Sequence, residues 1–159
     1  MGIYMENTKI PPEQTIGKIE GLLAATRCLG RSQKIYEDGR VRAFHFELEV
    51  PGGEPIAYML PARIDPVFDS LQRKRAVKFR KKGEERDREQ AIRTAWRQVL
   101  RWIEAQLALI DVGMVDPREV FMPYMAINKD QTFYQVIQER LDGGVRPAAL
   151  LDSGWEDDS

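Results

Sequence analysis

A run of basic side chains, RKRAVKFRKK at residues 73–82, is the part of the sequence best suited to binding a charged partner. It places seven Lys or Arg residues in ten positions of a 159-residue chain whose net charge is only −1. Cations this close together attract a polyanion such as DNA or RNA, because binding releases counterions condensed on the phosphates. The run equally suits an acidic protein surface or a solvated helix end with no partner.

A second set of basic side chains follows the run. Arg86, Arg93, Arg97 and Arg101 recur at steps of seven, four and four residues, which predicts a ridge along one face of a helix. Residues 73–101 carry 12 Lys or Arg and four Asp or Glu, so their local charge of +8 leaves −9 for the rest of the chain. We therefore expect phosphate contacts without base-specific readout. The candidate nucleic-acid-binding residues are Arg73, Lys74, Arg75, Lys78, Arg80, Lys81, Lys82, Arg93, Arg97 and Arg101.

One aromatic ring, Phe79, lies inside the basic run. An apolar ring at this place either anchors the helix end by packing or offers a face on which nucleic-acid bases stack. Packing is the commoner use of such a ring, so we expect Phe79 to be an anchor. Of the tryptophans on the following helix, we expect Trp96 to lie in the core and Trp102 to be half-buried.

Catalytic or metal-binding chemistry has little support in the sequence. His45 is the single histidine, so neither a histidine metal cluster nor a Ser-His-Asp triad can be assembled. It shares a strand face with Glu47 and Glu49, which we interpret as a polar surface. Cys28, the single cysteine, is expected to be a small core or helix-end residue. We therefore predict a protein that is not an enzyme and needs no cofactor.

Length and composition favour one α+β domain. With 159 residues, 43% of them hydrophobic and 31% charged, the chain is long enough to bury a core. No apolar run approaches the roughly 20 residues of a membrane span. The first residues lack the layout of a signal peptide, so we expect a cytoplasmic location. We predict a compact domain over residues 1–144 and a flexible acidic tail over residues 145–159, which could fold back over the basic region.

The N-terminal half is predicted to place one helix on a three-stranded antiparallel meander. Pro11 and Pro12 followed by apolar residues at helical spacing indicate a helix over about residues 12–27. Asp38-Gly39 is a strong hairpin signal between the first two strands, and residues 51–55 make the next connection. The middle strand alternates ionisable side chains with apolar ones that should face the helix, namely Phe44, Phe46 and Leu48.

The C-terminal half is predicted to be mostly helical. Asp65-Pro66 indicates a helix that begins with Asp65 as N-cap and continues through the basic run to about Gly83. A long amphipathic helix follows and ends at Gly113. Two shorter helices should begin after Asp116 and after Thr132.

A stretch of the long helix and the segment after it, TAWRQVLRWIEAQLALIDVGMVDPREVFMPYM, resembles small uncharacterised proteins encoded by tailed phages and prophages. The similarity covers about residues 91–137, and the upstream helix, three strands and LPAR segment also look similar. No activity is assigned to that group, so the resemblance implies a viral or mobile-element origin and an accessory role, without catalytic residues. The matching positions are Ala95-Trp96-Arg97, Trp102, residues 104–110, Gly113-Met114, Phe121, Pro123-Tyr124, Thr132 and Tyr134.

Several partners therefore stay open at this point. DNA or RNA would bind the basic region, and this is the partner that we favour. A host or viral protein could instead dock on the same basic surface or on the strand face around His45. A homo-oligomer is possible if Trp102 and Leu109 of the long helix are exposed.

Overall fold

The computed structural model describes residues 2–26 and 29–145. Cys28 and all but the first residue of the predicted acidic tail lie outside these residues. The elements, in chain order, are α1 (Pro12–Ala25), β1 (Leu29–Glu37), β2 (Arg40–Leu48), β3 (Ile56–Pro61), α2 (Ile64–Lys74), α3 (Val77–Arg80), α4 (Glu84–Asp111), α5 (Pro117–Phe121), the 3-10 turn η1 (Met122–Tyr124) and α6 (Phe133–Asp142).

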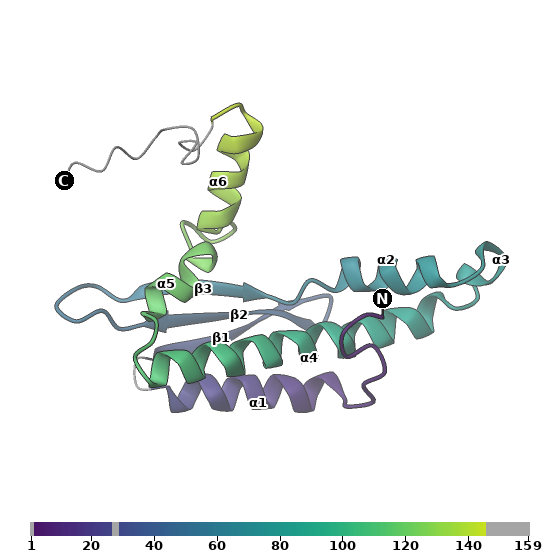
Figure 1. Ribbon diagram of the computed structural model, residues 1–159, viewed down its shortest axis with the longest axis horizontal. Coiled ribbons are helices and arrows are strands. Elements are labelled where there is room, and N and C mark those ends of the chain that lie inside the picture. Colours follow the sequence, from purple (N-terminus) through teal and green to yellow (C-terminus); the bar gives the residue numbers. More distant parts are fainter. Residues whose placement is uncertain (1, 27–28, 146–159) are drawn as a thin grey trace, which may run out of the picture.

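The main core lies between the sheet and two helices. The strands form an antiparallel meander in the order β1-β2-β3, and α1 and α4 run side by side along it (Figure 1). Phe44 of β2 meets Trp96 of α4 edge to face with ring centroids 5.8 Å apart, and Phe46 stacks on Tyr58 of β3 at 5.5 Å. This confirms the predicted α+β fold and the core position of Trp96, which is fully buried.

Both ends of the meander are closed by local structure. Asp38 and Gly39 have φ of 50° and 74°, as the predicted tight hairpin requires. The outer edge of β3 is met by the C-terminal segment at one point, an isolated bridge between Tyr58 and Met125 in which Ala126 N donates to Ala57 O at 2.8 Å. Such a contact shields part of an edge that could otherwise pair with other chains.

An antiparallel pair of helices extends beyond the sheet (Figure 1). We call this pair the arm: α2, α3 at its tip, and the first turns of α4, over residues 64–90. Val67 of α2 packs on Ala91 and Ala95 of α4 in a small second core. The predicted single helix from Asp65 to Gly83 is wrong, because α2 ends at Lys74 and Arg75 is extended, with φ −84° and ψ 144°.

Helix ends show where capping signals were reliable. At α5 and α6 the predicted caps are confirmed, since Asp116 and Thr132 each form a capping box, with Glu119 and Gln135. At α2 the prediction is wrong, because the N-cap is Arg63 and makes no side-chain cap. Asp65 instead accepts from Arg88 Nη1 of α4 at 2.8 Å, so its carboxylate joins the two helices of the arm.

The last helix is the least embedded element. α6 stands off the body (Figure 1), and none of its residues is buried. Tyr134 and Ile137 are 45% and 36% exposed. Within the described residues, no helix is long and apolar enough to cross a membrane.

Candidate nucleic-acid interface

The tip of the arm is held in place by an ion pair at its base. Arg75 donates from Nε to Asp87 Oδ2 at 2.6 Å and from Nη2 to Oδ1 at 2.7 Å. Gln72 Nε2 also donates to Oδ2, at 2.7 Å. Asp87 is 5% exposed, and the hydrogen bonds from Arg75 hold the pKa of its carboxyl below the usual value despite burial. This bidentate pair ties the end of α2 to the start of α4.

Gly83 leaves room for that ion pair. A Cβ built on Gly83 would lie 2.5 Å from Arg75 Nε and 2.6 Å from its Cζ. The guanidinium therefore lies directly across the residue that precedes α4. The chain reverses at this point because Arg75 turns back toward α4, so it is a structural member of the arm and is not free to bind phosphate.

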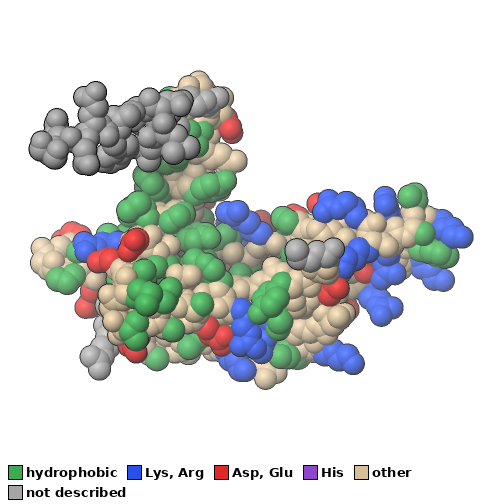
Figure 2. Space-filling view, viewed as in Figure 1, with side chains coloured by type: hydrophobic (Ala, Val, Ile, Leu, Met, Phe, Trp, Pro, Cys, Tyr) green, Lys and Arg blue, Asp and Glu red, His purple; other side chains and the backbone are tan. Residues whose placement is uncertain are grey.

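The cations beyond this pair face solvent at the tip. Lys78, Lys81 and Lys82 are exposed, and none of them forms an ion pair within the residues that the structure describes. Arg80 is half-buried and donates from Nε to Arg75 O at 3.3 Å. Figure 2 shows Lys and Arg side chains gathered on this end of the molecule. The tip thus presents lysines without carboxylate partners among the described residues, and the exposed Glu84 and Glu85 follow them at the start of α4.

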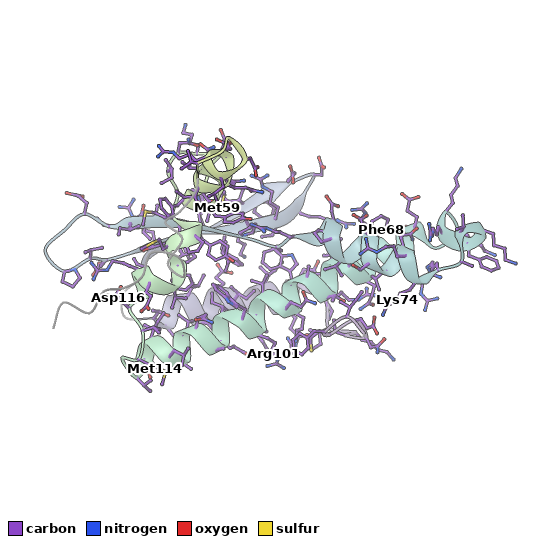
Figure 3. All side chains as sticks on the ribbon, turned by 45° about the horizontal axis from the view of Figure 1, so that its top comes forward. Met59, Phe68, Lys74, Arg101, Met114 and Asp116 are labelled. Atoms are coloured by element: carbon purple, nitrogen blue, oxygen red, sulfur yellow. The ribbon has the colours of Figure 1, made fainter. Side chains whose placement is uncertain are left out.

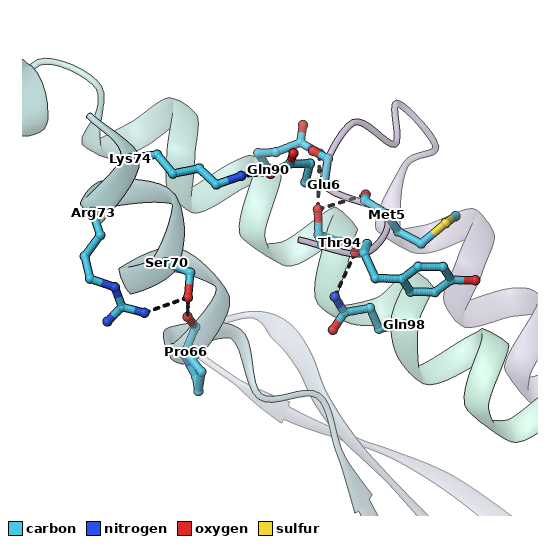
Figure 4. A network of polar contacts seen from close by, with 10 residues as sticks. Met5, Glu6, Pro66, Ser70, Arg73, Lys74, Gln90, Thr94 and Gln98 are labelled. Atoms are coloured by element: carbon cyan, nitrogen blue, oxygen red, sulfur yellow. Dashed lines mark hydrogen bonds and ion pairs between the residues drawn. The ribbon is translucent and has the colours of Figure 1, made fainter. Parts of the chain in front are cut away.

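Two predicted residues on α2 lie between the tip and the body. Arg73 is exposed and donates from Nη2 to Ser70 Oγ at 2.9 Å. Lys74 is also exposed, but it pairs with Glu6 of the N-terminal segment (Figure 4). This contact holds the pKa of the Glu6 carboxyl below its usual value. Arg73 therefore extends the free basic surface of the tip, whereas Lys74 is already neutralised.

The predicted ridge on α4 is not one exposed surface. Arg97 is only 6% exposed, and its Nε and Nη1 find no acceptor in the described part of the chain. Arg93 is half-buried and donates from Nη2 to Gln90 Oε1 at 2.6 Å. Arg101 is exposed and pairs with Glu104 at 2.9 Å. It lies on α4 away from Lys74, which ends α2 (Figure 3). The spacing was right for one helix face, but that face is partly covered.

The N-terminal segment, residues 2–10, also lies against α4, a contact that the sequence did not reveal. Three α4 side chains donate to its main-chain carbonyls (Figure 4): Gln98 Nε2 to Tyr4 O at 2.8 Å, Thr94 Oγ1 to Met5 O at 3.3 Å, and Gln90 Nε2 to Glu6 O at 2.7 Å. These donors are four residues apart and adjoin Arg97 on the helix surface. Because the acceptors are backbone atoms, the side chains of the segment give no sequence pattern from which these hydrogen bonds could be predicted.

Phe79 is not the anchor that the sequence predicted. Its side chain is 50% exposed, and the neighbouring Val77 is 75% exposed. Lys78 Nζ lies 5.0 Å from the centroid of the Phe79 ring. The four-residue helix α3 buries none of its residues, so it has no core that could receive the ring. An aromatic face is therefore accessible among the free cations.

Other candidate sites are less developed. His45 and Glu47 are half-buried, and His45 Nε2 is buried without a partner among the described residues. No group of three or more His, Cys, Asp or Glu residues there could hold a metal. A cleft of about 870 Å³ at one end of the sheet mixes arginines with acids, including Arg63 and Asp130. This mixture of charges favours neither an anionic nor a cationic ligand.

Apolar residues of the stretch 91–137 form a packing unit. Trp102, half-buried as predicted, meets Phe121 and Tyr124 with ring centroids 5.8 and 5.5 Å apart. Glu104 pairs with Arg101 at the surface. A scan against protein-family models and searches of curated proteins and of solved structures each found no match to the chain.

Proposed function

We propose that the protein is a non-enzymatic, phage-type accessory protein that binds DNA or RNA in the host-cell cytoplasm. It would contact phosphates through the arm without reading base sequence. The observation that carries this proposal is the set of exposed lysines at the end of a projecting helical hairpin, which form no ion pair with the residues that the structure describes. The resemblance of residues 91–137 to phage proteins supports the accessory role.

The geometry narrows the set of binding residues. Arg75 and Lys74 already have carboxylate partners, and Arg97 is buried. The phosphate contacts that we propose come from Arg73, Lys78, Arg80, Lys81 and Lys82. Because the tip projects from the body (Figure 1), a phosphate backbone can approach these cations from the end of the arm. Local positive charge of this kind also accelerates encounter with a polyanion.

Binding to labelled DNA and RNA at several salt concentrations tests the proposal. A variant with Lys78, Arg80, Lys81 and Lys82 changed to Glu should lose tight binding. Each phosphate contact removed should flatten the slope of log affinity against log salt by about 0.7–0.9. A matched control reverses four exposed cations on the body: Lys18, Arg31, Lys129 and Arg140. Absence of binding by the wild type at low salt, or equal losses in both variants, contradicts the proposal.

A second candidate function is a protein-interaction module that docks on a host or viral protein. The observation in its favour is α6, which buries no residue and leaves Tyr134 and Ile137 partly exposed. In-cell cross-linking of wild type, Ile137→Asp and the tip variant separates the two candidates. A stoichiometric protein complex lost only in Ile137→Asp favours the interaction module.

A further inference from the structure

We infer that the arm prefers single-stranded nucleic acid, with Phe79 as the surface on which a base stacks. This inference rests on the proposed function and adds the class of strand that the tip selects. Its basis is the half-exposed ring among free cations. Lysines neutralise phosphates of single and double strands alike, whereas a ring discriminates, because only an unpaired base can offer it an open face.

The position of Phe79 is fixed by its backbone. Phe79 N donates to Ala76 O at 2.9 Å, and Phe79 O accepts from Gly83 N at 3.0 Å. The ring is thus displayed from a short turn whose two ends are tied, and the turn itself is held by Arg75 and Asp87. Phe79 is 50% exposed, although burying a Phe side chain stabilises a fold by about 1.5–3 kcal/mol.

Lys78 complements the ring. Its Nζ lies 5.0 Å from the Phe79 centroid, within the range of a cation–π contact. A base could stack on the opposite face, or replace the ammonium, which would then be free to contact the adjacent phosphate. Lys81 and Lys82 follow two and three residues after the ring, so cations flank it on both sides in the chain. Alternation of a ring with cations is typical of surfaces that bind single strands.

Two other partners fit the tip less well. In a duplex the bases are stacked and paired, so the ring would reach one only after unstacking that costs a few kcal/mol. An anionic membrane also attracts lysines, but membrane-surface helices insert an extended apolar face. Here the exposed apolar residues of α3 are two side chains, Val77 and Phe79.

Fluorescence anisotropy at one low salt concentration tests this inference. The probes are a labelled oligothymidylate, an oligouridylate of the same length and a duplex of that length. Phe79→Leu keeps an apolar side chain but removes the ring. It should weaken binding of both single strands by about 5- to 100-fold and leave duplex binding within about twofold. Phe79→Trp keeps an aromatic ring and should bind both single strands about as tightly as the wild type does.

Val77→Ala is the matched control, because it trims an exposed apolar neighbour that has no ring. It should leave all three affinities unchanged. Equal affinity for strands and duplex, with no loss in Phe79→Leu, overturns the inference while the proposed function stands. So does a loss that is the same for strands and duplex, or tighter binding to vesicles containing phosphatidylserine than to any strand. No binding to any nucleic acid overturns the proposed function itself.

Discussion

The tip of the arm and the arginine ridge of α4 are both rich in positive charge in the sequence, but the structure places their side chains in opposite environments. At the tip, Lys78, Lys81 and Lys82 face solvent without carboxylate partners among the described residues. On the ridge, Arg97 is buried and Arg101 is paired with Glu104. Charge density along a sequence therefore does not measure the charge that a molecule presents.

What separates the two regions is the part of the chain that lies next to them. The ridge adjoins the N-terminal segment, which reaches α4 from more than 80 residues away in sequence, as the separation of 84 between Gln90 and Glu6 shows. The tip follows a chain reversal, and α3 buries none of its residues among those that the structure describes. Exposure of the tip is in turn maintained by the Arg75–Asp87 pair at its base.

The largest effect should come from removing that pair. Asp87→Ala would leave Arg75 without its carboxylate and Gln72 without its acceptor. Breaking a buried ion pair costs about 3–5 kcal/mol, and we expect about 2–3 kcal/mol here because the Arg75 side chain is 31% exposed. Urea unfolding measures the change. A loss below about 0.5 kcal/mol would mean that the arm is held without the pair.

Removing the buried charge of Arg97 should have the opposite effect and increase the free energy of unfolding. Arg97→Met keeps an unbranched side chain and removes a guanidinium whose Nε and Nη1 have no acceptor in the described part of the chain. Because an unpaired buried charge is costly, we expect the free energy of unfolding to rise by about 1–2 kcal/mol. The same variant should bind nucleic acid as the wild type does. Weaker binding would place Arg97 in the interface after all.

Acid should weaken the base of the tip through Asp87. Its pKa is lowered in the folded protein, so the stability it contributes is complete above the unfolded value of about 3.9. That contribution is lost as the pH falls through the folded pKa. Unfolding followed from pH 6 to pH 2, about the range that covers this transition, should show a smaller acid-dependent loss in Asp87→Asn than in the wild type. Parallel curves would contradict this assignment.

The smallest effect should come from the exposed end of the ridge. Lys82→Glu and Arg101→Glu make the same change of charge at two places. Lys82 lies just before α4, and Arg101 lies about 26 Å along that helix from its start, about three screening lengths at physiological salt. We expect Lys82→Glu to flatten the salt slope by about 0.7–0.9 and Arg101→Glu to change affinity less than about threefold. Equal effects would mean that the ridge contributes as much as the tip.

Local patterns predicted turns and helix ends correctly where one or two residues determine the local backbone conformation. Asp38-Gly39, Asp116 and Thr132 act within a few residues of themselves, and the hairpin and both caps formed as expected. The predicted helix through Arg75 was wrong: Arg75 is extended and pairs with Asp87, 12 residues further along the chain, a contact that local patterns do not show. The predicted exposure of Arg97 was wrong because burial depends on tertiary packing around α4. Phe79 was misjudged since its type favours packing, while α3 offers nothing to pack against.

The way the N-terminal segment is attached has a consequence for sequence drift. Its carbonyls at Tyr4, Met5 and Glu6 are held by side chains of α4, so replacement of most segment side chains leaves these bonds intact. Outside the segment, attachment therefore depends on Gln90, Thr94 and Gln98, spaced four apart on α4, in addition to Lys74, which pairs with the Glu6 side chain. In related chains the first ten residues can diverge beyond alignment while this triplet still marks where they lie.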